Sequence, residues 1–192
     1  MCIRDRTWAF EFENQPWFAG FRVMASNGVT LPVFNVFRMY SKMGGDRVAV
    51  TSDGAIPLDA LIASGVRGKP DVAALASRDA KKLTVMAWHY HDDDVAGPDA
   101  AVTLAIDGLG LKSGTAKLTQ YRIDATHSNA YTAWQKMGSP ASPSAAQIQE
   151  LEAASQLARL AGGPATIDVK DGTASLAMTL PRQAVALVVV EW

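Results

Sequence analysis

The sequence predicts a mostly β chain, in which one β/α unit precedes an antiparallel β-sandwich that carries inserted helices. Short runs of alternating apolar and polar residues recur along most of the chain, and turn signals such as Asn27-Gly28 and Asp171-Gly172 separate them. A helical pattern between residues 144 and 161 interrupts these runs. The chain has 192 residues, of which 48% are hydrophobic, which is enough to bury a core.

The first block, from Thr7 to about Gly45, is typical of a strand, a long loop and a helix. An aromatic run, Trp8 to Phe12, predicts the strand, and a loop containing Pro16 follows it. Pro32 stands where the first residue of a helix belongs, and Gly44-Gly45 ends the helical pattern. The predicted apolar stripe of this helix consists of Val33, Val36, Phe37, Tyr40 and Met43.

The second block, about Asp46 to Asp124, predicts short antiparallel strands. In the run from Lys82 to His91, Leu83, Val85, Ala87, His89 and His91 share one face, and the residues between them share the other. A turn is expected at Arg78-Asp79. The expected strands are Arg47 to Thr51, Val72 to Ser77, Lys82 to His91, Val102 to Ile106 and Ala116 to Ile123.

The third block predicts a helix and then more strands. Ser144 is the expected N-cap, and Gln147 completes a capping box. An apolar stripe leads to the stop at Gly162-Gly163-Pro164, and it consists of Ile148, Leu151, Ala154, Ala158 and Ala161. Strands are expected at Thr166 to Val169, Ala174 to Leu180 and Ala184 to Val190. The last run is apolar on both faces, which predicts a buried central strand.

Composition argues against several classes of protein. No apolar run approaches the ~20 residues that span a bilayer, so we expect no membrane partner. The formal net charge is -1 and no basic cluster is longer than Lys81-Lys82, so we expect no nucleic-acid partner. Cys2 is the only cysteine, which excludes an intramolecular disulfide. Compartment and oligomeric state stay open.

Residues 1–6 form a segment that we interpret separately. The start lacks a basic region followed by an apolar region, so it does not have the pattern of a signal peptide. Met-Cys-Ile-Arg-Asp can be spelled ATG TGT ATA AGA GAC, a string used as a transposon adaptor in shotgun libraries. Our hypothesis is that residues 1–6 are a sequencing-adaptor scar and that the biological sequence is entered in mid-protein near Thr7.

The first candidate site lies in the opening stretch. In a strand, Glu11 and Glu13 share a face and lie ~6.6 Å apart along its axis. Carboxylates roughly 5–5.5 Å apart serve retaining glycosidases, and roughly 6.5–9.5 Å serves inverting ones. The simpler interpretation is a solvated strand edge. The surrounding aromatic residues favour a sugar site, because C–H faces of sugars stack on aromatic rings.

Histidines supply two further candidates. His89 and His91 with Asp92 to Asp94 have ligand types for zinc or non-haem iron. Three consecutive Asp at a strand end are more often a solvated turn, so we expect no metal. His127 lies beside Ser128 and near Asp124, which are the residue types of a Ser-His-Asp set. No Gly-x-Ser-x-Gly elbow accompanies them, and we expect no triad.

The stretch from Ser128 to Ser144 is rich in aromatic and small residues. A short helix capped by Ser128 or Asn129 would place Tyr131 and Trp134 three residues apart on one face. The rings could simply form a satellite hydrophobic cluster. We favour a docking surface for a neighbouring domain, because the segment joins two structural regimes.

Three stretches together resemble a known family. Residues 7–45, TWAFEFENQPWFAGFRVMASNGVTLPVFNVFRMYSKMGG, resemble the eighth β/α unit of family 39 glycoside hydrolases, the retaining β-xylosidases and their relatives. VMAWHYHDDD and RIDATHSNAYTAWQKMGSP resemble the carboxyl-terminal sandwich region of the bacterial members. The resemblance implies a (β/α)8 barrel with a β-sandwich on its flank. Residues 7–45 would be the last unit of the truncated barrel, and 46–192 the sandwich, with a helical insertion at about 128–162.

The resemblance also implies site residues. The two catalytic glutamates of the family lie at the ends of the fourth and seventh barrel strands, so we expect no catalytic residue in this chain and no activity from it alone. A family Trp and Glu at the sugar subsite fall on Trp8 and Glu13. This chain is shorter between them than other members, so Glu11 is a rival for that role. The implied substrate is a β-xyloside, and neither a metal nor an organic cofactor is needed.

A second hypothesis comes from a different class of protein. The sandwich could be a stand-alone carbohydrate-binding or interaction module, with Trp88, Trp134 and Tyr131 as ligand platforms. Against it, a lone barrel strand would serve no purpose in such a module and would expose an apolar edge.

Overall fold

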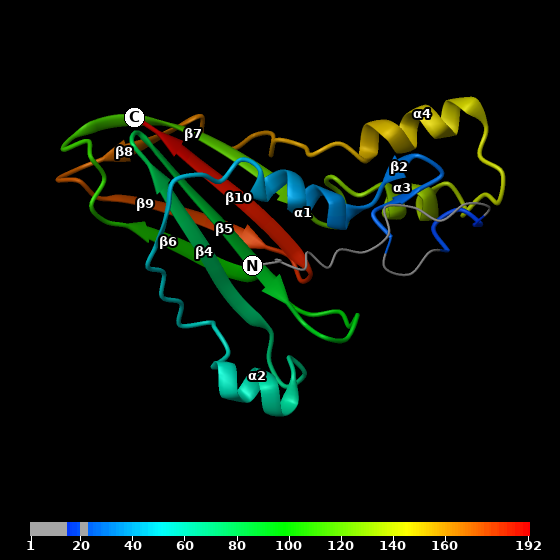
Figure 1. The fold of residues 1–192 in the computed structure, drawn as a ribbon, viewed down its shortest axis with the longest axis horizontal. Coiled ribbons are helices and arrows are strands. Elements are labelled where there is room, and N and C mark those ends of the chain that lie inside the picture. The colour runs from blue at the N-terminus through cyan, green and yellow to red at the C-terminus, as the bar shows by residue number, and fades with distance from the viewer. Residues whose placement is uncertain (1–14, 20–22) are drawn as a thin grey trace, which may run out of the picture.

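A β-sandwich forms one end of the molecule, and a cluster of short helices forms the other (Figure 1). The computed structural model describes residues 15–19 and 23–192. The described helices are α1 (Pro32–Tyr40), α2 (Leu58–Ser64), α3 (Ala130–Lys136) and α4 (Ala145–Ala154). The described strands are β1 (Ala25–Ser26), β2 (Val29–Thr30), β3 (Asp46–Val48), β4 (Asp71–Asp79), β5 (Lys82–Tyr90), β6 (Ala100–Ile106), β7 (Gly114–Ile123), β8 (Thr166–Val169), β9 (Ala174–Leu180) and β10 (Ala184–Glu191).

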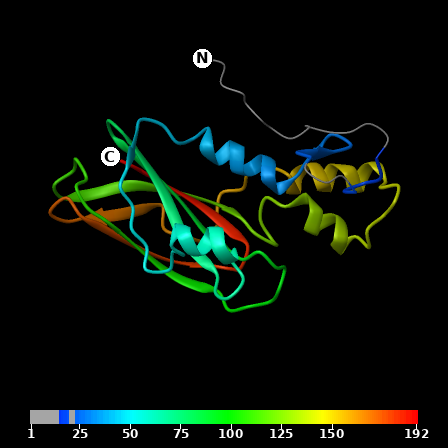
Figure 2. The same ribbon diagram turned by 60° about the horizontal axis from the view of Figure 1, so that its bottom comes forward.

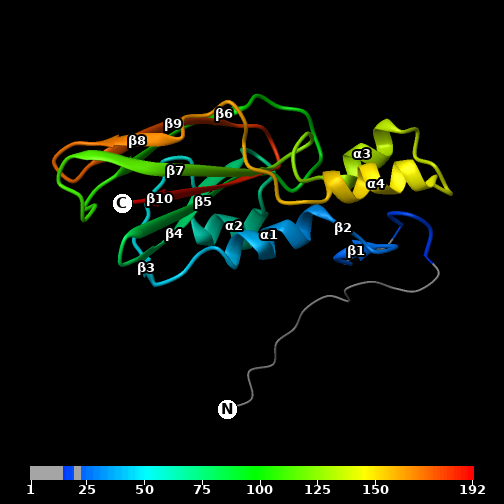
Figure 3. The ribbon, with the colours of Figure 1, turned by 90° about the horizontal axis from the view of Figure 1, so that it is seen from above.

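The sandwich has two unequal antiparallel layers. The larger sheet has the strand order β3-β4-β5-β10-β7-β8, and β6 pairs with β9 in the smaller one. Apolar residues from both layers meet between them, among them Val85, Val188 and Leu176. Figure 3 shows β6 and β9 on one side of the larger sheet and α1 and α2 on the other. The predicted fold class, a mostly β antiparallel sandwich with inserted helices, is confirmed for the described residues.

Strand β10 lies at the centre of the larger sheet, as its apolar sequence predicts. It pairs with β5 on one side and β7 on the other. Val188 and Val190 point into the space between the two sheets, whereas Leu187 and Val189 pack toward α1. A strand that is buried on both faces needs apolar residues on both, and β10 has them from Ala184 to Val190.

Helix α1 covers the outer face of the larger sheet. Met39 is fully buried and packs against Met86 and Leu187. The predicted apolar stripe is partly wrong, because Phe37 and Tyr40 remain 48% and 49% exposed. The helix is apolar around more than one face, so periodicity alone does not reveal which face meets the sheet.

The predicted turns at Asn27-Gly28 and Asp171-Gly172 are confirmed. In both pairs each residue has a positive φ: 48° and 82° in the first, 51° and 76° in the second. These values suit the tight hairpin turns whose twist matches that of the flanking strands. The expected turn at Arg78-Asp79 is displaced, because β4 continues through Asp79 and pairs that residue with Lys82.

The structure differs from the expected helices in two places. Helix α2 was not expected, and none of its residues is buried, so no amphipathic stripe identifies it. Helix α4 has the predicted Ser144–Gln147 capping box but ends at Ala154, so Ala158 and Ala161 are not helical. Beyond α4 the chain runs beside β7 instead, where the Leu160 N–H donates to the Gln120 carbonyl at 2.8 Å.

No helix in the described part of the chain is long and apolar enough to cross a membrane. Figure 2 shows α3 and α4 together at the end of the molecule away from the two sheets, with β1 and β2 nearby.

Candidate functional site

The predicted sugar-binding residues Trp8, Glu11 and Glu13 lie outside the described residues, so their roles stay predictions. The structure does describe Trp17 and Phe18, further along the same stretch. The ring centroid of Phe18 lies 5.1 Å from that of Trp134 and 5.8 Å from that of Tyr131. The opening stretch, which carries the predicted sugar site, therefore packs against α3 through Phe18.

Three rings, those of Phe18, Tyr131 and Trp134, form what we call the aromatic anchor. Tyr131 and Trp134 stack with their centroids 5.9 Å apart, and the Trp134 indole N–H donates to the Pro140 carbonyl at 3.0 Å. The Phe18 main-chain N–H donates to Ser26 Oγ at 2.7 Å. Such ring pairs contribute roughly 0.5–1.5 kcal/mol each beyond their buried area. The expected helix cap at Asn129 is confirmed, since its side chain accepts from the Thr132 N–H.

A buried asparagine joins α1 to the two helices of the insertion. Asn35 is fully buried, and its Nδ2 donates to the carbonyls of Ser128 and Ser155, both at 2.9 Å. Its Oδ1 accepts from Arg38 Nη1 at 2.8 Å. The sequence analysis missed this residue. The only signal is a polar residue within an otherwise apolar stretch of helix.

The loop before α3 holds an Asp–His pair. Asp124 is buried, and its Oδ1 accepts from the main-chain N–H of Thr126 at 2.7 Å and from that of His127 at 2.9 Å. His127 Nδ1 lies 2.9 Å from the same oxygen and 3.1 Å from Oδ2. Burial alone would raise the pKa of Asp124, but the hydrogen bonds from Thr126 and His127 together lower that pKa below its ordinary value.

A Ser-His-Asp triad is not assembled here. The Ser128 hydroxyl donates to the Arg122 carbonyl at 2.7 Å and accepts from the Ala158 N–H at 2.8 Å. Both bonds hold the hydroxyl on the main chain. The side chain of Arg122 lies 3.9 Å from Asp124 Oδ2. Burial lowers the pKa of Arg122, and the carboxylates of Asp124 and Asp99 oppose that shift.

The histidines of β5 and the following turn serve the fold. His89 Nδ1 lies 2.9 Å from the Leu180 carbonyl, and His91 Nε2 lies 3.0 Å from the Arg67 carbonyl. Asp92 accepts from the Val66 N–H at 2.8 Å, so its partly exposed side chain belongs to the fold, whereas Asp93 and Asp94 are exposed, as in a solvated turn. Within residues 15–19 and 23–192, no group of three or more His, Cys, Asp or Glu side chains could hold a metal ion.

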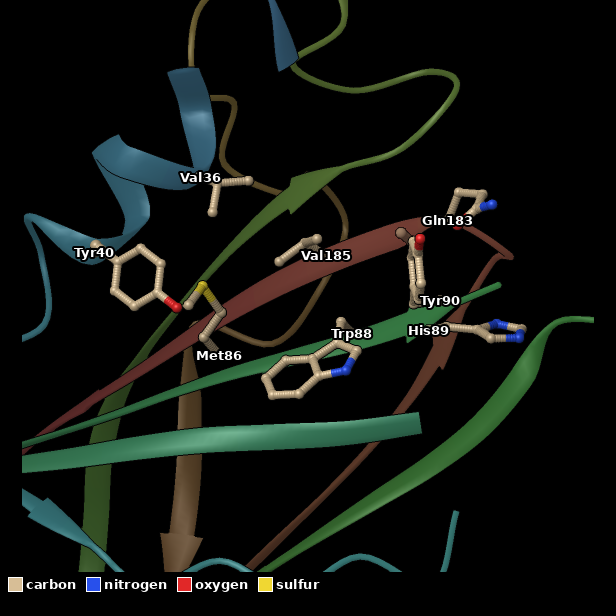
Figure 4. Close-up of a pocket in the computed structure, with 9 residues that line it drawn as sticks. Val36, Tyr40, Met86, Trp88, His89, Tyr90, Gln183 and Val185 are labelled. Carbon is tan, nitrogen blue, oxygen red and sulfur yellow. The ribbon is translucent and has the colours of Figure 1, made fainter. Parts of the chain in front are cut away.

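An aromatic groove of about 250 Å³ lies between α1 and β5 (Figure 4). Tyr40, Trp88 and Tyr90 surround it, and Met86 and Val185 form its floor. The Trp88 indole N–H donates to Asp71 Oδ2 at 2.7 Å, which fixes the ring. Burial and the nearby Asp92 raise the pKa of Tyr90. This lining suits binding rather than catalysis, because apolar and aromatic side chains dominate it.

A comparison with family models supplies the assignment. Residues 5–170 match the model of the glycosyl hydrolases family 39. The chain belongs to this family. The match covers the opening stretch, the helical insertion and most of the sandwich, including β5. No curated protein sequence matches this family 39 chain.

Solved structures agree with the fold. The chain is similar to a monomeric β-xylosidase from Caulobacter crescentus CB15, with 22% identity and a TM-score of 0.62 over 92% of this chain and 34% of that one. A GH39 enzyme from Xanthomonas axonopodis pv. citri has 16% identity and a TM-score of 0.69, over 92% and 33%. A bacterial orthologue of human α-L-iduronidase has 22% identity and a TM-score of 0.66, over 85% and 27%. The family 39 chain thus spans about a third of these proteins.

Proposed function

We propose that this family 39 chain is the carboxyl-terminal part of a retaining glycosidase that acts on β-xylosides. The observation that carries the proposal is the family match over residues 5–170. In a retaining mechanism, one carboxylic acid protonates the leaving oxygen and a second carboxylate forms the glycosyl-enzyme. Both glutamates would belong to barrel strands that precede this sequence, so the chain alone would be inactive and would need no cofactor.

Within this proposal the opening stretch forms one wall of the sugar subsite. Trp8 would shape the floor of the subsite, and Glu13, or its rival Glu11, would accept a hydrogen bond from a sugar hydroxyl. Neither would transfer a proton. The aromatic anchor supports this role, because it holds the stretch at Phe18, a few residues beyond Glu13. A wall of a binding site needs such a fixed position to act on specificity.

The domain division is part of the same proposal. Residues 1–6 would be a scar, 7–45 the eighth β/α unit of the barrel, and 46–192 the sandwich. The surface of α1 supports a missing neighbour. Met39 faces the sheet, whereas Phe37 and Tyr40 leave a second apolar face half exposed. We propose that the remaining units of the barrel cover that second face, since exposed aromatic patches mark interaction surfaces.

The test begins at the gene. Long-read sequencing upstream of the Thr7 codon is expected to show an open frame with repeated strand–helix patterns and glutamates at the fourth and seventh strands. Expressed in full, that protein should hydrolyse 4-nitrophenyl β-D-xylopyranoside, and Glu13→Gln should lower kcat/KM roughly tenfold or more. The 192-residue chain should be inactive. A frame that begins at Met1 with the same six codons, or hydrolysis by the short chain, would contradict the proposal.

The aromatic groove favours a second candidate, a carbohydrate-binding or interaction module. Trp88 is held by Asp71 beside Tyr40 and Tyr90, which is an arrangement on which a sugar ring could stack. If this were the function, the 192-residue chain would be retarded on xylan affinity gels and Trp88→Ala would abolish the retardation. Unchanged migration of the native chain would exclude it.

A further inference from the structure

A polar cleft lies between the loop of residues 125–129, α3 and α4. Its volume is about 300 Å³, which is at the lower end of the roughly 300–1,000 Å³ found for small-molecule sites. We call it the His127 cleft. Four of the side chains that line it carry polar groups that can reach a ligand: His127, Lys136, Glu150 and Gln156.

The orientation of His127 is fixed by the chain itself. Asp124 is buried and its pKa is lowered, so it is an ionised carboxylate that only accepts hydrogen bonds. His127 Nδ1 lies 2.9 Å from this carboxylate and 2.9 Å from Thr126 Oγ1, and the Thr126 hydroxyl donates its own proton to the same carboxylate, so Nδ1 carries a proton. In the neutral ring the other nitrogen, Nε2, is then an acceptor. Asp124 thus holds the His127 ring in one orientation, in which His127 Nε2 is a hydrogen-bond acceptor for the cleft.

Other polar groups of the cleft are already used within the fold. Asn129 donates to the Asp124 carbonyl and accepts from the Thr132 N–H, and Ser128 bonds to the main chain through its hydroxyl. Gln156 uses only its Nε2, which donates to the Glu152 carbonyl at 3.1 Å. No hydrogen bond or ion pair to another described residue engages His127 Nε2, Lys136 Nζ, the Glu150 carboxylate or Gln156 Oε1.

These four free groups define the chemistry of a ligand. Three of them, on His127, Glu150 and Gln156, are acceptors, whereas Lys136 is a donor. A small anion offers no donor to the three acceptors and is repelled by the carboxylate. A cation could meet the three acceptors, but it offers no acceptor to Lys136, which only donates. A neutral molecule with several hydroxyl groups can donate to the acceptors and accept from the ammonium group at the same time.

We propose that the His127 cleft binds a pyranoside, a sugar ring held through its hydroxyl groups. The proposal goes beyond the function given above, because it concerns binding by this chain rather than hydrolysis by the whole protein. The cleft would place a second sugar contact on the helical insertion, whereas the predicted subsite residues Trp8 and Glu13 belong to the opening stretch.

The experiment is an NMR titration of the 192-residue chain with methyl β-D-xylopyranoside. The imidazole signals of His127 should shift saturably, with saturation transfer to the sugar. Glu150→Gln and Lys136→Met change exposed side chains, so the fold should be preserved. Each should weaken the apparent Kd by roughly three- to tenfold, because each loses or weakens one hydrogen bond to a charged group.

Glu152→Gln is the matched control, since Glu152 is an exposed carboxylate on the same helix that does not line the cleft. It should leave the titration unchanged. The proposal is overturned if His127 does not respond to the glycoside, if Glu150→Gln and Glu152→Gln behave alike, or if sodium formate shifts His127 and the glycoside does not. Since no hydrolysis is measured, these results do not depend on whether the whole protein is a xylosidase.

Discussion

At the scale of single residues, Asn35 joins three segments that lie far apart in the sequence. Its amide bonds to carbonyls that lie 93 and 120 positions further along the chain. Asn35→Ala would leave two buried carbonyls without this donor, and Arg38 would lose one of its three acceptors, since it also donates to Thr30 Oγ1 and to the Ser155 carbonyl. We expect the free energy of unfolding to fall by about 2–4 kcal/mol in chemical denaturation. Gln149→Ala, an exposed change on α4, should alter it by less than about 0.5 kcal/mol; equal midpoints for both variants would contradict the role of Asn35.

Asp124 makes stability depend on pH in a definite direction. Because the folded-state pKa of Asp124 is lowered, the folded chain binds its proton less readily than the unfolded chain does. Its stabilising contribution is therefore complete above the unfolded pKa of about 3.9 and is lost as the pH falls through the lower folded pKa. Arg122 and His127 face this carboxylate. Denaturation curves from pH 6 downward should show a steeper loss of stability for the native chain than for Asp124→Asn. The same slope in both would exclude Asp124 as a source of acid sensitivity.

At the scale of elements, the capping box of α4 could be predicted from the sequence because its two partners lie three residues apart. The Ser144 Oγ accepts from the Gln147 N–H, and the Gln147 side chain accepts from the Ser144 N–H at 2.9 Å. Ser144→Ala should lower the free energy of unfolding by about 1 kcal/mol. Ser142→Ala, which changes an exposed serine nearby, is the control and should have no measurable effect. If both changes are neutral, the cap does not contribute to the folded state.

What the sequence could predict follows from how local each signal is. Strand β5 could be predicted because its sequence separates into two alternating faces. Strand β10 could be predicted because its apolar residues form a continuous run. The end of α4 was not, since its apolar pattern continues into a segment that pairs with β7 instead. The site divides in the same way. The Asn129 cap is local, whereas the contacts of Asn35 and the anchoring of Phe18 join residues that only the tertiary structure brings together.

At the scale of the whole molecule, the proposed function predicts different roles for two exposed apolar surfaces. Phe37 and Tyr40 lie on α1, and Leu58 and Ile62, which are 69% and 77% exposed, lie on α2. In the 192-residue chain, changing Leu58 and Ile62 to serine should leave the free energy of unfolding nearly unchanged, and changing Phe37 and Tyr40, which are about half buried, should lower it less than in the complete protein. In the complete protein, the missing barrel is proposed to cover only the α1 pair.

The α1 pair therefore provides the test of how the two parts join. In the complete protein, Phe37→Ser with Tyr40→Ser should lower the stability of the barrel–sandwich junction by roughly 2–4 kcal/mol, since two aromatic side chains would lose buried area. Leu58→Ser with Ile62→Ser should have no such effect. Limited proteolysis between residues 41 and 45, together with thermal unfolding, would report the difference. If the α2 pair destabilises the complete protein and the α1 pair does not, the barrel covers α2, and the open face of α1 must have another partner.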